Sequence, residues 1–179
     1  MDMNLANKLT MLRVVMIPVF LVVLFMAPEP MNRYIAVIIF IVASLTDMLD
    51  GKIARKYNLV SNFGKFMDPL ADKLLVMSAL VSMVALKDLA AWVVIVILAR
   101  EFTITGFRTL AMEANIVMAA SWWGKVKTTV QMIMIPVVLL NLPFGCMPMV
   151  ETALIYLSVF FTIFSGADYI IKNKQVLLG

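Results

Sequence analysis

Residues 46–72 read "TDMLDGKIARKYNLVSNFGKFMDPLAD" and lie between two long apolar runs. The stretch holds four aspartates, which are Asp47, Asp50, Asp68 and Asp72. The first two are three residues apart and the last two are four apart, so each pair lies on one face of a helix. Two carboxylate pairs therefore sit at the ends of neighbouring apolar segments, where an ordinary membrane helix has no need of them.

Apolar segments dominate the chain. Of its 179 residues 63% are hydrophobic, whereas a soluble domain is nearer half apolar. A membrane-spanning helix needs about 20 mostly apolar residues. Six segments approach this length, at residues 9–27, 34–50, 67–86, 89–110, 125–142 and 149–171. We therefore predict an all-α, polytopic membrane protein with six transmembrane helices, which forms a single domain over residues 1–179.

Basic residues set the expected orientation. With six spans both termini lie on one side of the membrane, and that side collects all but two of the 15 lysines and arginines. Only Arg33 and Lys87 fall on the other side. Because cytoplasmic loops carry the excess of basic residues, we expect both termini in the cytoplasm. Both aspartate pairs then lie near the cytoplasmic edge of the membrane.

Composition limits the available chemistry. The chain has no histidine and a single cysteine, Cys146. Serine hydrolysis by a histidine-containing triad, phosphohistidine transfer and histidine-ligated zinc are therefore excluded, as is an intrachain disulfide. Catalysis must come from Asp, Glu, Lys, Arg and Tyr.

The four aspartates favour a metal site. Carboxylates that converge at one membrane edge repel one another unless protons or cations neutralise them. Carboxylate oxygens suit Mg²⁺ or Mn²⁺, and two such ions would balance the four charges and stabilise phosphoryl or pyrophosphate chemistry. Taken singly, each aspartate could instead be a cap or an ion-pair partner, with Asp50 at a helix end and Asp68 as an N-cap ahead of Pro69.

The full pattern, D-x2-D-G-x2-A-R-x8-G-x3-D-x3-D, resembles the signature of the CDP-alcohol phosphotransferases. In that family a CDP-linked donor loses CMP, and its phosphoryl-alcohol part moves to an acceptor hydroxyl. The resemblance assigns metal binding to the four aspartates and makes Asp72 the base for the acceptor hydroxyl. It places Gly51, Ala54, Arg55 and Gly64 at the nucleotide. The small residues allow close approach to the helix backbone, and an arginine can bind a phosphate.

Three further segments, "NKLTMLRVVMIPVF" from residue 7, "AREFTITGFRTLA" from residue 99 and "GKVKTTVQM" from residue 124, resemble the phosphatidylglycerophosphate synthases of that family. The implied reaction joins CDP-diacylglycerol and glycerol 3-phosphate to give phosphatidylglycerophosphate and CMP. The resemblance also implies a homodimer in the bacterial cytoplasmic membrane, with its active site facing the cytoplasm and no nucleic acid polymer as a partner.

Four basic residues favour an acceptor that carries its own phosphate. Arg100 and Arg108 lie close to one face of the fourth span, and Lys125 and Lys127 begin the fifth. Arg100 lies in an apolar span, which is costly without a partner or a function. The arginine could instead pair with Glu101 or Glu113, and the two lysines could be ordinary cytoplasmic anchors.

A polar face near the start of the chain has two interpretations. Asn7, Thr10 and Arg13 are spaced three residues apart, so they share one face of a helix. They could contact the cytidine or the lipid phosphate of the donor. They could equally be the start of a helix at the membrane interface.

Two kinds of rival function stay open at this point. The first is a synthase of the same family that uses inositol phosphate, serine or phosphatidylglycerol as its acceptor. The second is a divalent-cation transporter with the aspartates as its filter. Against transport, all four aspartates lie at one membrane edge and none at mid-depth.

Overall fold

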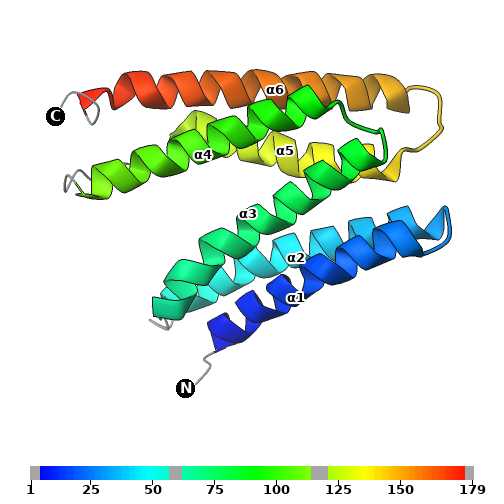
Figure 1. The fold of residues 1–179 in the computed structure, drawn as a ribbon, viewed down its shortest axis with the longest axis horizontal. Helices are drawn as coiled ribbons and strands as arrows, with labels where there is room; N and C mark the ends of the chain where they lie inside the picture. Colours follow the sequence, from blue (N-terminus) through cyan, green and yellow to red (C-terminus); the bar gives the residue numbers. More distant parts are fainter. Residues whose placement is uncertain (1–4, 57–61, 114–120, 176–179) are drawn as a thin grey trace. The chain divides into compact units, whose positions relative to one another are not determined.

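The computed structural model describes residues 5–56, 62–113 and 121–175, without the side chains of residues 5–7, 47–56, 62–66, 68 and 69. Within those ranges the chain is entirely helical apart from its turns, which confirms the predicted all-α class (Figure 1). The described helices are α1 (Leu5–Met26), α2 (Met31–Lys56), α3 (Asn62–Ala85), α4 (Ala91–Glu113), α5 (Trp122–Leu140) and α6 (Met147–Lys172). Each overlaps one of the six predicted segments.

The helices fall into two compact units, Met1–Met83 and Val84–Gly179. The first unit contains α1, α2 and nearly all of α3, and the second contains α4, α5 and α6.

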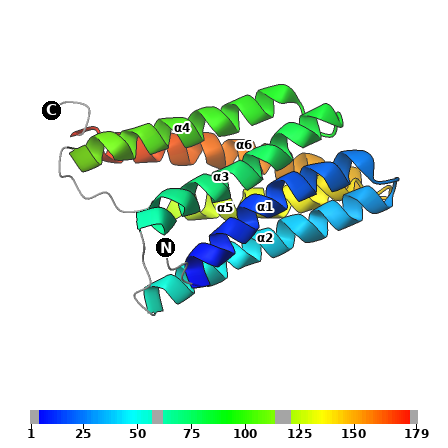
Figure 2. The same ribbon diagram turned by 60° about the horizontal axis from the view of Figure 1, so that its bottom comes forward.

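In the first unit α1 and α2 form an antiparallel hairpin, and the two helices lie side by side in both ribbon views (Figure 1 and Figure 2). Each helix buries one stripe of residues spaced mostly three or four apart, which is the spacing of a single helix face. The buried residues of α1 are Thr10, Arg13, Ile17, Phe20 and Leu24, and those of α2 are Asn32, Ala36, Val37, Phe40 and Ala43. The outer face of α1 is apolar and exposed, with Leu12, Val15, Val19 and Val22.

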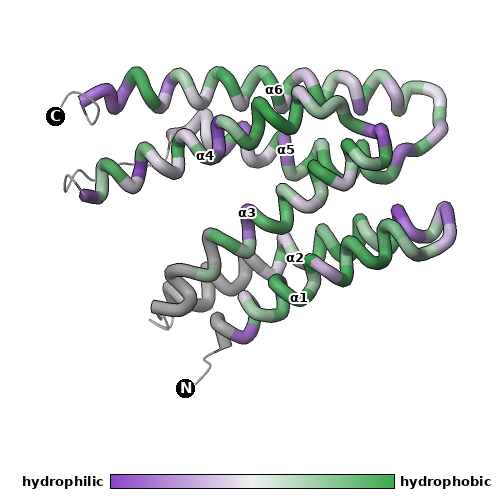
Figure 3. Tube along the Cα trace, viewed as in Figure 1, coloured by the Kyte–Doolittle hydropathy of each residue, from purple (hydrophilic) through white to green (hydrophobic). Residues whose placement is uncertain are grey.

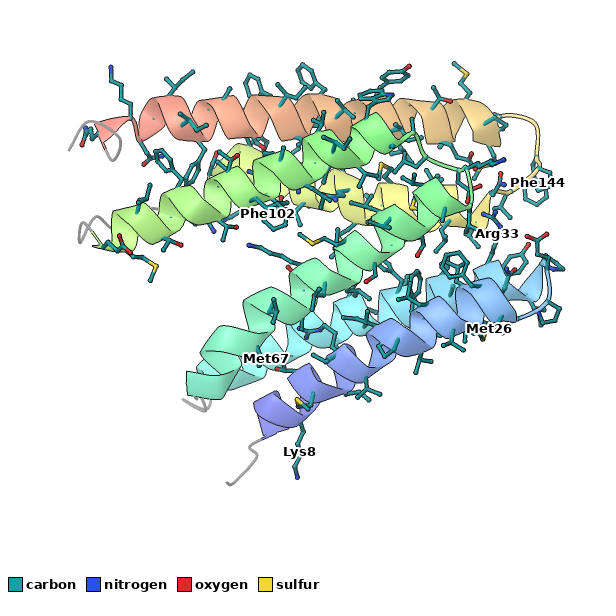
Figure 4. The ribbon with its side chains drawn as sticks, in the orientation of Figure 1. Lys8, Met26, Arg33, Met67, Phe102 and Phe144 are labelled. Carbon is teal, nitrogen blue, oxygen red and sulfur yellow. The ribbon has the colours of Figure 1, made fainter. Side chains whose placement is uncertain are left out.

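Asn32 fastens the turn between α1 and α2. Its side-chain amide donates to the carbonyl of Leu24 at 2.9 Å, and its side-chain oxygen accepts from the backbone N–H of Arg33 at 2.8 Å. The last carbonyls of a helix have no partner within the helix, so Asn32 satisfies one of them. Arg33 and Met26 mark this end of the hairpin in Figure 4, and Lys8 lies at the opposite end.

In the second unit α5 and α6 form another hairpin, and α4 packs against α6. Helix α5 ends at Asn141, whose left-handed backbone (φ 44°, ψ 56°) lets its N–H bond the carbonyl of Val138. Near the far end of α6, Tyr169 packs its ring edge to face with Phe107 of α4, with the ring centroids 6.2 Å apart. The contact between Phe107 and Tyr169 joins α4 to this end of α6.

Helix α6 has its polar side inside and its apolar side outside. It buries Ser158, Thr162, Ser165 and Gly166, while Phe160, Ile163 and Phe164 are 40% to 58% exposed. Such an arrangement is unfavourable in water and typical of a membrane, where small and polar residues join helices and apolar residues face lipid.

Several exposed threonines in the second unit hydrogen-bond to the backbone of their own helix. The hydroxyls of Thr105, Thr109, Thr128 and Thr129 each donate to the carbonyl four residues earlier, at 2.7 to 3.2 Å. These four hydroxyl protons are therefore hydrogen-bonded without water, as an apolar environment requires.

Three of the described helices are long and apolar enough to cross a membrane, over Lys8–Met26, Trp122–Leu140 and Met147–Lys172. A shorter apolar stretch covers Met31–Thr46 in α2. Figure 3 shows hydrophobic residues along these helices and hydrophilic ones gathered toward several helix ends. The protein is therefore an all-helical membrane protein.

Candidate active site

The two aspartate pairs lie on continuous helices. Helix α2 runs past Asp47 and Asp50 as far as Lys56, and α3 begins at Asn62, well before Asp68. Asp50 is thus not a helix end and Asp68 is not an N-cap, so neither capping alternative holds. The expected spans ended at residue 50 and began at residue 67 because the polar signature is helical without being apolar.

Helical geometry keeps each pair together. Since α2 and α3 are unbroken through the signature, Asp47 and Asp50 share one face of α2, and Asp68 and Asp72 share one face of α3. Residues 57–61 connect the two helices, so Lys56 and Asn62 lie no more than about 21 Å apart. Asp72 is half-buried. Four carboxylates on two connected helices are a donor set that fits hard divalent cations.

Several predicted site residues lie outside the described side chains. These are the metal ligands Asp47, Asp50 and Asp68 and the nucleotide residues Gly51, Ala54, Arg55 and Gly64, whose backbone is helical. Their roles stay predictions.

The polar face of α1 points into the first unit. Thr10 and Arg13 are buried, with 1% and 0% of their surface exposed, and the Nε of Arg13 donates to the carbonyl of Ala43 at 3.4 Å. Ala43 lies one helical turn before Asp47. The guanidinium is therefore held inside the α1–α2 interface next to the aspartate segment, a position that suits a role at the site. The side chain of Asn7 is outside the described set.

In the second unit an ion cluster joins α4 to α5. We use this name for Arg100, Glu101 and Lys127. The carboxylate of Glu101 accepts from Arg100 Nη1 at 3.1 Å and also from Lys127 Nζ. The three side chains are 14%, 24% and 4% exposed. The alternative in which Arg100 pairs with Glu101 is thus found in the structure, and Lys127 is a buried partner of the same carboxylate rather than a surface anchor.

Two glycines leave room for Arg100. A Cβ built on Gly166 of α6 would lie 3.2 Å from Arg100 Cγ, and one built on Gly124 of α5 would lie 3.5 Å from Arg100 Nη2. The arginine side chain thus passes along the backbones of both helices. A larger residue at Gly166 would push it out of place.

Arg108 has a different partner. Its Nε donates to the hydroxyl of Tyr169 at 3.1 Å, and its guanidinium carbon lies 5.4 Å from the centre of that ring. Lys125 is exposed, while Lys127, two residues further on, is buried. The four predicted cations are therefore divided, because the structure joins only Arg100 and Lys127 in one cluster.

A polar contact ties the start of α5 to the end of α6. Ser121 precedes α5, yet its hydroxyl makes no cap hydrogen bond and instead donates to Asp168 Oδ2 at 3.0 Å. Asp168 also pairs with Lys172 at 2.7 Å. The bond from Ser121 joins the start of α5 to the end of α6, whereas the pair with Lys172 lies within α6.

Sequence reasoning did not find the joint role of Glu101 or the bond from Arg108 to Tyr169. A glutamate next to an arginine inside an apolar helix was a signal for the first. The second joins residues 61 apart in the chain, and only the packing of α4 on α6 brings them together.

Comparisons with known proteins agree with this picture. The profile of the CDP-alcohol phosphatidyltransferase family matches residues 3–164. A CDP-diacylglycerol–glycerol-3-phosphate 3-phosphatidyltransferase of Bacillus subtilis (strain 168) is 44% identical over 97% of each chain. A probable phosphatidylglycerophosphate synthase of Mycobacterium tuberculosis (strain CDC 1551 / Oshkosh) is 42% identical over 98% of this chain and 84% of its own.

A third relative widens the comparison. A CDP-diacylglycerol–glycerol-3-phosphate 3-phosphatidyltransferase of Haemophilus influenzae is 36% identical over 99% of this chain and 97% of its own. The match thus extends well beyond the aspartate signature to include α4, α5 and α6, and it favours transferase chemistry over cation transport. The chain belongs to the CDP-alcohol phosphatidyltransferase family.

Proposed function

We propose that this protein transfers the phosphatidyl group of CDP-diacylglycerol to glycerol 3-phosphate, which gives phosphatidylglycerophosphate and CMP. The observation that carries the proposal is the complete aspartate signature on the continuous helices α2 and α3. The acceptor is suggested by relatives that carry this activity in their names and align over nearly the whole chain.

The reaction replaces the phosphoanhydride bond of the donor by a phosphate ester bond to the acceptor. The acceptor hydroxyl oxygen bonds to the phosphorus that carries the diacylglycerol, and the bond from that phosphorus to the oxygen bridging to CMP breaks. CMP leaves with the electron pair of the broken bond. We assign the hydroxyl proton to the carboxylate of Asp72, since a positioned base contributes roughly 10²–10⁴-fold to a rate.

The aspartates would hold two divalent cations, Mg²⁺ or Mn²⁺. Asp47 and Asp50 from α2 and Asp68 and Asp72 from α3 form a set of oxygen ligands that suits these ions. Bound there, such ions neutralise the charge of a pyrophosphate and of departing CMP.

Donor binding would use the remaining signature residues and the start of α1. We assign Gly51, Ala54, Arg55 and Gly64 to the nucleotide. Thr10 and Arg13 are buried, and Arg13 bonds the carbonyl of Ala43, one helical turn before Asp47. This position supports a role at the donor phosphates for Arg13 and for Thr10 and Asn7 on the same helix face.

Acceptor binding would use the phosphate of glycerol 3-phosphate. The buried side of this site would be formed by Lys127 and the largely buried Arg100. The exposed side would be formed by Arg108 and Lys125. Arginine has five N–H donors, and Glu101 engages Arg100 at Nη1, so other donors are available for charge-assisted bonds to a phosphate.

We further propose six transmembrane spans with both termini in the cytoplasm, in the cytoplasmic membrane of a bacterium. The distribution of basic residues supports this topology. The active site would then face the cytoplasm, where it meets a lipid from the membrane and a soluble acceptor from water. A homodimer is the proposed assembly.

The test is product formation by purified protein in detergent. CDP-diacylglycerol, Mg²⁺ and glycerol 3-phosphate should give CMP and phosphatidylglycerophosphate in equal amounts. Asp72→Asn should abolish both products while the variant stays folded. Metal uptake into liposomes by folded protein that releases no CMP would overturn the proposal.

A further inference from the structure

Glu101 is a carboxylate that neither the aspartate signature nor the predicted cation set uses. It lies on α4 beside Arg100, and it accepts hydrogen bonds from Arg100 Nη1 at 3.1 Å and from Lys127 Nζ of α5. The lysine is 26 residues away in the chain. One carboxylate oxygen, Oε1, is the acceptor in both bonds.

Burial makes this contact necessary. The side chain of Lys127 is 4% exposed and that of Arg100 is 14% exposed. Two cations so close together repel each other, and removing them from water is costly unless an opposite charge with good geometry lies between them. Glu101 supplies that charge, and the cluster of three keeps one net positive charge.

The arginine is also fixed from its other side. Gly166 of α6 and Gly124 of α5 let the side chain pass 3.2 to 3.5 Å from where their Cβ atoms would stand. Arg100 therefore passes close to the backbones of both helices, and Glu101 accepts a hydrogen bond from its guanidinium end. The Nε of Arg100 is buried and makes no hydrogen bond within the part of the chain that the structure describes.

We propose that Glu101 is a positioning residue for the acceptor. It holds Arg100 and Lys127 as one preorganised cationic site for the acceptor's phosphate, and its own carboxylate stays away from that anion. The inference rests on the proposed function, since it presumes that these two cations bind glycerol 3-phosphate. Preorganised charges bind a ligand without the cost of assembling them at that moment.

The test compares Glu101→Gln with Glu113→Gln. Glu113 is exposed at the end of the same helix, so it undergoes the same loss of charge outside the cluster. Glu101→Gln should raise the apparent KM for glycerol 3-phosphate about tenfold or more, because Arg100 and Lys127 lose the carboxylate charge that both of them bond. The KM for CDP-diacylglycerol should stay within about twofold. Glu113→Gln should leave both constants unchanged.

KM separates positioning from folding. A purely structural role would lower the fraction of active enzyme, and hence the rate per total protein, without changing the KM of the enzyme that remains. Glu101→Asp provides a second variant if Glu101→Gln does not fold. Aspartate keeps the negative charge on a side chain that is one methylene shorter. This variant should raise the KM for glycerol 3-phosphate several-fold.

A double variant tests whether Glu101 acts through its lysine. In a Lys127→Gln background, Glu101→Gln should raise KM much less than it does alone, since the two residues form one unit. Unchanged KM for glycerol 3-phosphate in Glu101→Gln or Glu101→Asp, from wild type that makes phosphatidylglycerophosphate, would overturn the inference alone. Wild type that makes no such product would overturn the proposed function, and the inference with it.

Discussion

Replacing Gly166 by alanine tests how tightly α6 holds Arg100. The new Cβ would stand 3.2 Å from Arg100 Cγ. Carbon atoms prefer separations of about 3.5–4.0 Å, so the arginine must move by roughly 0.3 Å or more. It has little freedom to do so, because Glu101 accepts a hydrogen bond from its Nη1, and its Nη2 lies only 3.5 Å from where a Cβ on Gly124 of α5 would stand.

Two opposing terms set the effect on stability. Alanine in place of glycine favours a helix by about 1 kcal/mol, whereas overpacking a buried site costs about 1–3 kcal/mol. We expect a net loss of about 0–2 kcal/mol. Displacing Arg100 should also weaken acceptor binding, and a loss of about 1 kcal/mol would raise the KM for glycerol 3-phosphate roughly fivefold.

Gly106→Ala is the matched control. Gly106 lies on α4 and is exposed, and among the described residues no atom outside its own stretch of helix lies within 4 Å of a Cβ built on it. This variant should gain the helix preference alone, with up to about 1 kcal/mol of added stability and no change in KM. Thermal unfolding in detergent and acceptor kinetics would be measured for both. Equal unfolding temperatures and equal KM values for glycerol 3-phosphate in Gly166→Ala and Gly106→Ala would contradict the predicted displacement of Arg100.

Three further predictions address the metal, Arg108 and the α5–α6 contact. EDTA should abolish CMP release and excess Mg²⁺ should restore it; full activity in EDTA would argue against the metal site. Tyr169→Phe removes the hydroxyl that accepts a hydrogen bond from Arg108. If the lost bond is worth about 1–2 kcal/mol to acceptor binding, the KM for glycerol 3-phosphate should rise about fivefold to thirtyfold. An unchanged KM would show that Arg108 does not bind the acceptor. Ser121→Ala removes a bond to Asp168 between the start of α5 and the end of α6 and should lower the unfolding temperature, with unchanged KM. Lys172→Ala removes an ion pair within α6 whose lysine is exposed, so it should lower the unfolding temperature less than Ser121→Ala does; a larger effect of Lys172→Ala would show that the Ser121 contact is not what stabilises the hairpin.

The all-α class and the approximate positions of the helices could be predicted from the sequence, because apolar runs mark the parts of a helix that face lipid or the core. Helix ends could not. Helix α2 continues to Lys56 and α3 starts at Asn62, both beyond the apolar runs. A hydrophobicity pattern cannot detect a polar segment that is helical. The interpretations of Asp50 as a helix end and Asp68 as an N-cap could therefore be excluded only from the backbone.

The candidate site, like the helices, could be predicted from the sequence only in part. The aspartate signature is local, so spacing alone placed its residues on helix faces. The ion cluster depends on the packing of α4 and α5 against α6, which brings their side chains together, and the bond from Arg108 to Tyr169 depends on packing between α4 and α6. Neither follows from spacing within a helix. Residues such as Arg100 and Lys127 were suspected because charge in an apolar segment is costly, but their partners required the tertiary structure.

The most direct measurement of the central claim is a comparison of acceptors. Purified protein would receive CDP-diacylglycerol and Mg²⁺ with glycerol 3-phosphate, inositol phosphate, serine or phosphatidylglycerol, one at a time, and the lipid product would be identified in each case. We predict a new lipid only with glycerol 3-phosphate, and that lipid should be phosphatidylglycerophosphate. A product formed with another acceptor and none with glycerol 3-phosphate would keep the family but contradict the proposed reaction and the roles given to Arg100 and Lys127.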